Sequence, residues 1–183
     1  MKQGFTLLEV LLSTFLFALI LIALFDMFLG YKKIFDIQQA FVGVTGNARD
    51  LVGAVAKSAR GADSIVSSHL FSGVTYASGT TTVVFELPSI NSSGDIIPST
   101  YDYVTVYALG SNVYQLTETG VGSARSAGSK QLTNVLQSII FTYDSSIFAN
   151  VKQVTVEITT ATTTRLRAAQ QHLREQIYLR NAP

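Results

Sequence analysis

The sequence predicts an α+β fold, in which the second half of a long N-terminal helix packs on an antiparallel β-sheet. Three observations predict it. Residues 5–25 are apolar except for one charged residue, Glu9, and a few residues with hydroxyl groups. Helical spacing of apolar residues continues to about Arg60, and it then changes to alternation. We expect a membrane-spanning helix at 5–30 and a soluble domain at 31–183, made of an amphipathic helix at 31–60 and a β-sheet domain at 61–183.

The first segment has the length of a membrane-spanning helix. Phe5 to Phe25 would span about 31 Å, close to the thickness of a bilayer's hydrocarbon core. No Pro or Gly interrupts it. A backbone in lipid must satisfy its own hydrogen bonds, so the segment should be helical.

Two simpler roles compete for this segment. A cleaved secretory signal is disfavoured, because the positive region is short and bulky residues, not a small-x-small site, follow the apolar run. A plain membrane anchor is the stronger alternative. Lys2 precedes the span, while Asp26, Lys32 and Lys33 follow it, so the flanking charges barely favour either orientation.

Glu9 is the feature that a plain anchor leaves unexplained. A carboxylate facing the membrane interior costs a few kcal/mol on insertion scales. One reading is that it is simply protonated near the headgroups. The other is that an assembled state supplies a cation, since an ionisable group in a membrane is by default a functional hypothesis with a partner.

Gly4-Phe5-Thr6-Leu7-Leu8-Glu9-Val10-Leu11 resembles the processing site of type IV prepilins and type II secretion pseudopilins. The resemblance implies that residues 1–4 are a leader peptide. Prepilin peptidase would cut between Gly4 and Phe5 and methylate the new amino group of Phe5. Glu9 would then compensate the ammonium group of a neighbouring subunit during filament assembly.

The resemblance also implies a place and partners. The protein would be a single-pass inner (cytoplasmic) membrane protein, with its C-terminal domain outside the cytoplasm, and would later enter a type IV pilus or a secretion or competence pseudopilus. Its partners would be the peptidase/methyltransferase, other subunits and the membrane. Many major pilins have a Pro near the end of the apolar run, where this chain has Asp26. The chain therefore fits a minor pilin or pseudopilin better.

The predicted helix continues beyond the membrane as one apolar stripe. Gly61 suits its C-terminal stop. Gly43, Gly46 and Gly53 indicate either close packing or a locally soft helix. A coiled coil is the rival interpretation, but packing against a sheet is the commoner use of such a face. The stripe comprises Ile34, Ile37, Phe41, Val44, Ala48, Leu51, Val55 and Ala59.

Alternation of apolar residues predicts about five strands of one antiparallel sheet. Residues 165–180 suit either a helix or an edge strand, and we expect a strand from about His172. Asn91–Ser99 and Gly120–Lys130 are expected to be loops. The five strands are expected at Thr81–Leu87, Tyr101–Leu109, Val113–Thr119, Leu136–Tyr143 and Val151–Thr160.

The sequence gives no support for catalysis. There is no cysteine, and His69 and His172 lie in no catalytic motif. We therefore expect neither an enzyme nor a cofactor or metal. The net charge of +1 disfavours direct nucleic-acid binding. The alternative function is a single-pass membrane-anchored binding domain that never polymerises.

Overall fold

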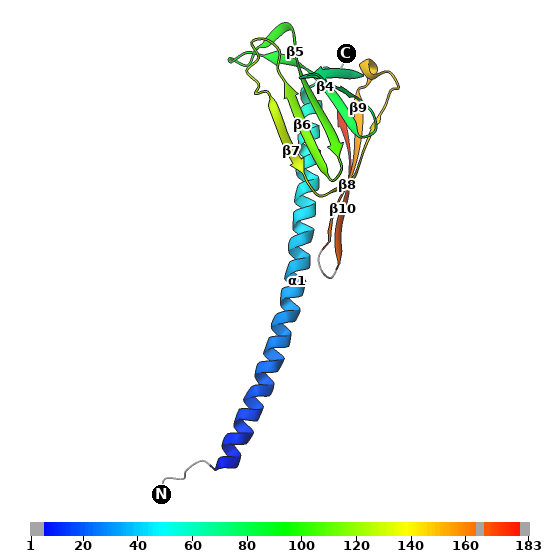
Figure 1. Ribbon diagram of the computed structural model, residues 1–183. Coiled ribbons are helices and arrows are strands. Elements are labelled where there is room, and N and C mark those ends of the chain that lie inside the picture. The colour runs from blue at the N-terminus through cyan, green and yellow to red at the C-terminus, as the bar shows by residue number, and fades with distance from the viewer. Residues whose placement is uncertain (1–5, 164–166, 180–183) are drawn as a thin grey trace.

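The computed structural model describes residues 6–163 and 167–179, and it confirms the α+β fold. One long helix rises from the N-terminal end, and its upper part carries the β region (Figure 1). The elements are α1 (Leu7–Gly61), β1 (Ser64–Ile65), β2 (Ser68–Phe71), β3 (Val74–Ala77), β4 (Thr82–Ile90), β5 (Ile96–Leu109), β6 (Asn112–Glu118), β7 (Gly128–Thr133), β8 (Leu136–Tyr143), the short 3₁₀ helix η1 (Phe148–Asn150), β9 (Gln153–Thr163) and β10 (Ala168–Tyr178).

Helix α1 runs unbroken for 55 residues, about 82 Å at the standard rise. The single helix predicted to end near Arg60 is confirmed. It ends after Gly61, because Ala62 is extended and donates its N–H to the carbonyl of Ala59. The chain then turns into the β region.

Only the second half of the predicted stripe is buried. The β region covers α1 from Val44 onward, and Leu51, Val55 and Ala59 are fully buried. Ile34 and Phe41 remain about half exposed. The stripe therefore extends beyond the β region that was expected to cover it.

The expectation of one β-sheet is wrong. The strands form a five-stranded sheet in the order β1-β4-β5-β6-β7, a three-stranded sheet in the order β10-β9-β8, and a β2-β3 hairpin. All pairs are antiparallel. After β7 the chain leaves the first sheet, and β8 pairs with β9 instead of β7. Backbone bonds such as Phe141 N–H to the Thr80 carbonyl, at 2.8 Å, still join the two sheets.

All five predicted strands exist, within a few residues of their expected bounds. The C-terminal strand is also confirmed, although β10 begins at Ala168 and not near His172. Both predicted loops are wrong at their ends, because β5 begins at Ile96, inside the predicted Asn91–Ser99 loop, and β7 begins at Gly128, inside the predicted Gly120–Lys130 loop. The first four residues of β7 are exposed and polar or small, so this strand lacks the apolar alternation by which the five strands were predicted.

The core lies between the second half of α1 and the two larger sheets. Leu51 and Val55 share one buried cluster with Phe85 and Val106 of the first sheet and Ile158 of the second. Complete burial of each such side chain contributes about 1.5–3 kcal/mol. The folded β region thus depends on α1 as its central element.

The helix leaves the β region through a polar junction. The hydroxyl of Thr160, fully buried, donates to the carbonyl of Val44 at 2.9 Å. One turn on, Thr133 donates its hydroxyl to the side-chain oxygen of Asn47 at 3.1 Å. These bonds join both sheets to the place where α1 emerges.

The helix glycines do not mark close packing within the chain. A Cβ added to Gly43, Gly46 or Gly53 would meet no heavy atom within 4 Å. Of the two interpretations drawn from the sequence, close packing inside this chain is therefore wrong.

Replacing Thr160 by Val should destabilise the β region by about 1 kcal/mol, because a buried hydrogen bond is lost without a change of shape. Urea unfolding in detergent, followed by tyrosine fluorescence, measures this. Thr142→Val, at an exposed position of β8, is the matched control and should change stability by less than half as much. Equal stability of the two variants would contradict the junction's role.

Candidate functional site

The first turn of α1 is closed by a reciprocal cap between Thr6 and Glu9. Thr6 is extended, and its hydroxyl oxygen accepts the backbone N–H of Glu9 at 3.4 Å. In return, Glu9 Oε2 accepts the backbone N–H of Thr6 at 2.9 Å and its hydroxyl at 3.0 Å. This is a capping box, which satisfies donors that a helix start otherwise leaves unpaired.

The cap gives Glu9 a local role that our sequence analysis missed. The signal was present, because Thr6-Leu7-Leu8-Glu9 is a T-x-x-E pattern directly before an apolar run. Both contacts reach Oε2, and among the described residues Oε1 accepts no hydrogen bond. Gly4 and Phe5, the predicted processing residues, lie outside the described residues.

The helix that follows the cap is long and apolar enough to cross a membrane. Every residue of α1 from Leu7 to Leu29 is exposed, and Figure 1 shows this part of the helix extending away from the β region. These residues span about 34 Å. A soluble protein rarely exposes so much contiguous apolar surface, so this one requires lipid or other protein.

The two other polar positions in the middle of this segment bond to their own helix. The hydroxyl of Ser13 donates to the Val10 carbonyl at 2.9 Å, and that of Thr14 donates to the Leu11 carbonyl at 3.0 Å. Their polarity is therefore hidden from an apolar environment. Glu9 alone brings a net charge into the segment Leu7–Phe25.

The histidines form no catalytic arrangement in the described part of the chain. His172 is exposed on β10. His69 stacks on Tyr103, with ring centroids 3.6 Å apart, and its Nε2 lies 3.6 Å from a carboxylate oxygen of Glu118. No group of three or more His, Cys, Asp or Glu suited to a metal ion occurs among residues 6–163 and 167–179.

Tyr103 and Tyr107 of β5 belong to an aromatic layer that also contains His69, Tyr76 and Tyr114. Tyr107 packs near Tyr76 and stacks on Tyr114, with centroids 4.7 and 5.6 Å apart. Burial, reinforced by Glu86, raises the pKa of Tyr103 to about 12. This layer holds the β2-β3 hairpin against the five-stranded sheet.

A buried charge in the β region also escaped sequence analysis. Asp102 is completely buried, and its carboxylate is ion-paired with Arg125. It also accepts hydrogen bonds from the hydroxyls of Ser89 and Ser123 and from the Gly120 N–H, at 2.7 to 2.8 Å. The partners come from positions far apart in the sequence, so only the fold brings them together.

This network anchors the loop between β6 and β7. A Cβ at Gly120 would lie 2.5 Å from Thr100 Cγ2 and 2.7 Å from the Tyr101 carbonyl oxygen, so no side chain fits. Burial alone would raise the pKa of Asp102, but the bonds from Ser89, Arg125, Gly120 and Ser123 hold the pKa below its ordinary value. We interpret the network as structural.

Comparisons of the chain with protein-family models, with curated proteins and with solved structures found no match. The function is therefore inferred from the N-terminal motif and from the geometry of Thr6, Glu9 and α1.

Asp102→Asn should destabilise the β region by about 2–3 kcal/mol. The loss falls below the range of about 3–5 kcal/mol for a fully buried pair, because Arg125 keeps some contact with water. Urea unfolding at pH 7 measures it. Arg174→Gln, which removes an exposed pair with Glu157, is the control and should change stability by less than about 1 kcal/mol.

The same network predicts a pH dependence. A carboxylate whose pKa is lowered by folding stabilises the fold above the unfolded pKa, about 3.9, and this stabilisation is lost as the pH falls through the folded pKa. Wild-type stability should therefore fall below about pH 4 more steeply than that of Asp102→Asn. Parallel pH profiles of the two proteins would contradict this account.

Proposed function

We propose that the protein is a structural subunit, a minor pilin or pseudopilin, of a type IV pilus or of a secretion or competence pseudopilus. The single observation that carries this proposal is the position of Glu9. This carboxylate lies in the first turn of an exposed apolar helix, and that helix follows closely on the Gly4-Phe5 sequence. Prepilin peptidase removes residues 1–4 and methylates Phe5. The mature chain then joins other subunits through α1.

Electrostatics favours a partner for Glu9 beyond its cap. The donors in the capping box, a backbone N–H and a hydroxyl, are both neutral. These two donors reduce the cost of removing the Glu9 carboxylate from water, but they leave its net negative charge in the apolar segment. An ammonium group at low dielectric compensates that charge far more strongly than it would in water. The new amino group of Phe5 in a neighbouring subunit is such a cation.

The positions of the two charges favour an open filament. Phe5 and Glu9 are only four residues apart in the sequence, so each mature subunit would carry the cation and the carboxylate within one short segment. When a second subunit is displaced along the helix axis, its N-terminal ammonium group can reach Glu9 of the first subunit. The Glu9 of the second subunit then remains open to the ammonium group of a third. Such a contact is heterologous and does not close, so it propagates as a helical assembly.

The surface of α1 supports the same arrangement. Apolar side chains remain exposed between the end of the apolar run and the β region, among them Tyr31, Ile34, Phe35 and Phe41. Packing of neighbouring helices covers them in a filament. We place the protein first in the inner (cytoplasmic) membrane, with the β region outside the cytoplasm, and then in the pilus or pseudopilus.

The alternative is a membrane-anchored binding domain that does not polymerise. One observation favours it, because the Thr6–Glu9 capping box gives the carboxylate a use within its own chain. On that alternative, Glu9 matters only for the helix start.

The capping box itself provides the test that separates the two functions. Glu9→Gln removes the charge but keeps a residue able to complete the box. Thr6→Ala removes the cap, at a cost of about 1 kcal/mol, and keeps the charge. The proposal predicts that Glu9→Gln inserts into the membrane but is lost from sheared filaments, whereas Thr6→Ala is incorporated. Immunoblots of the membrane and filament fractions measure both.

Asp26→Asn is the matched control, because it removes the next acid along the same helix and should be incorporated normally. If Glu9→Gln is incorporated as well as the wild type, the charge pairing is wrong. If Thr6→Ala fails and Glu9→Gln succeeds, Glu9 acts as a cap alone.

A further inference from the structure

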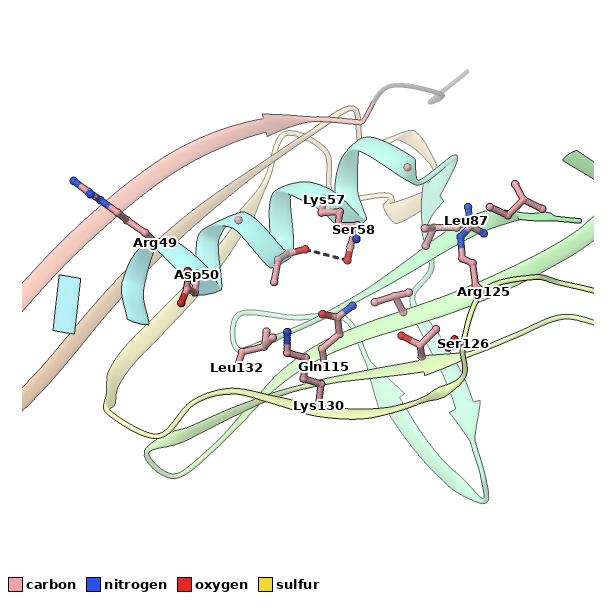
Figure 2. A pocket seen from close by; sticks show the side chains of 16 residues that line it. Arg49, Asp50, Lys57, Ser58, Leu87, Gln115, Arg125, Ser126, Lys130 and Leu132 are labelled. Atoms are coloured by element: carbon pink, nitrogen blue, oxygen red, sulfur yellow. Dashed lines mark hydrogen bonds between the residues drawn. The ribbon is translucent and has the colours of Figure 1, made fainter. Parts of the chain in front are cut away.

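An open groove of about 1040 Å³ lies along one side of the second half of α1, between the helix and part of the inner face of the five-stranded sheet. Figure 2 shows the helix on one side of the groove and strands of the sheet on the other. The groove follows α1 from Arg49 to Gly61, a length of about 18 Å. Leu87 and Val104, both nearly buried, belong to its apolar lining.

Small residues on α1 keep this groove open. Gly53, Ala54, Ser58 and Gly61 line it. A Cβ placed on Gly53 would have no heavy atom within 4 Å, so there is free space directly above the helix backbone. The Ser58 hydroxyl donates to the Ala54 carbonyl of its own helix, which leaves the lining without a competing polar group at that point.

The charges around the groove are mostly positive. Arg49, Lys57, Arg125 and Lys130 line it, against one carboxylate, Asp50. Lys57 lies on the helix and Lys130 on the facing strand, while Arg49 extends away from Lys130 (Figure 2). Asp102 pairs with Arg125, but no carboxylate of the described residues forms an ion pair with Lys57 or Lys130. Lys57 and Lys130 are therefore the two cations on which recognition in the groove would depend.

Among the described residues, the rim of the groove is also formed by an edge strand. Lys130 and Leu132 belong to β7, the last strand of its sheet, which is paired with β6 on one side only. An extended segment can add to such an edge through main-chain hydrogen bonds, with alternate side chains entering the adjoining groove. Lys130 discourages random pairing at this edge and favours an acidic segment.

We propose that this groove binds an extended acidic segment of a partner protein, with apolar side chains alternating with carboxylates. The apolar side chains pack over Gly53, Leu87 and Val104, and the carboxylates face Lys57 and Lys130. At about 3.3 Å per residue, the groove accommodates about five residues of extended chain. This inference concerns partner recognition by the β region and does not depend on filament assembly.

A peptide suits the site better than a lipid headgroup does. The groove begins 20 residues beyond Leu29, about 30 Å along the helix from the end of the apolar run. A membrane-inserted α1 therefore holds the groove well away from the bilayer surface. The cations are also spread along the groove, and do not converge on one point as a compact anion would require.

The test uses the full chain in detergent micelles and a fluorescein-labelled hexapeptide of alternating aspartate and valine. Fluorescence anisotropy should show saturable binding that weakens with added salt. Peptides with lysine or serine in place of aspartate should bind at least about tenfold more weakly. Equal binding of the three peptides, or no binding of the aspartate peptide, overturns the proposal.

Two glycine variants locate the binding site. Gly53→Leu fills the groove from the helix side and should abolish peptide binding. Gly46→Leu is the matched control, since it lies on the same helix in equally open space but does not line the groove, and it should bind as the wild type does. Unchanged urea unfolding of both variants shows that the fold is intact. Wild-type affinity in Gly53→Leu overturns the proposal.

Charge variants test the recognition. Lys57→Glu and Lys130→Glu should each weaken binding about tenfold, because attraction is replaced by repulsion. Lys152→Glu, an exposed lysine outside the groove, should have no effect. Binding of dihexanoyl-phosphatidylglycerol, but not of the peptide, would assign the groove to a lipid. Self-association lost in Gly53→Leu without peptide binding would assign it to a second copy. Either result overturns the proposal.

Discussion

The charge of Glu9 in an apolar helix is the constraint on which this account depends. The chain supplies neutral donors to one oxygen of that carboxylate through the Thr6 cap. Neutral donors orient a carboxylate, but they do not cancel its charge in a medium of low dielectric. A cation must come from elsewhere, and in the proposed filament a processed neighbouring subunit would supply one at the start of its helix. Glu9 can therefore contribute both to the cap of its own helix and to the pairing of subunits.

The rest of the fold follows from dividing one helix between two surroundings. Below Val44, none of the described residues of α1 is buried, and the exposed apolar side chains need lipid or neighbouring helices. Above it, Leu51, Val55 and Ala59 form the centre of a core that both larger sheets share. The hydrogen bond between Thr160 and the Val44 carbonyl marks the boundary between the exposed part of α1 and the part covered by the β region. Where α1 faces the five-stranded sheet, small residues leave a groove lined by Lys57 and Lys130, which is the proposed surface for recognition of an acidic segment.

Sequence reasoning predicted the features that depend on local pattern. The apolar run and its stripe predicted α1 to within a few residues, and alternation such as Val154, Val156 and Ile158 predicted the main strands. It did not predict that these strands divide into two sheets, because alternation identifies a buried face but not the partner strand. Nor did it predict the network at Asp102, since Ser89, Gly120, Ser123 and Arg125 meet this residue only through tertiary contacts. The Thr6–Glu9 cap was local and readable from the sequence.

The measurement that tests the central claim most directly is the intact mass of the protein purified from its native membrane, with sequencing of its N-terminal peptide. A subunit assembled through Glu9 requires a free, methylated amino group on Phe5, so the account predicts a chain that begins there and carries one added methyl group. A native protein that retains residues 1–4 ahead of Phe5 would have no ammonium at the required position. That result would contradict the account and favour the membrane-anchored binding domain.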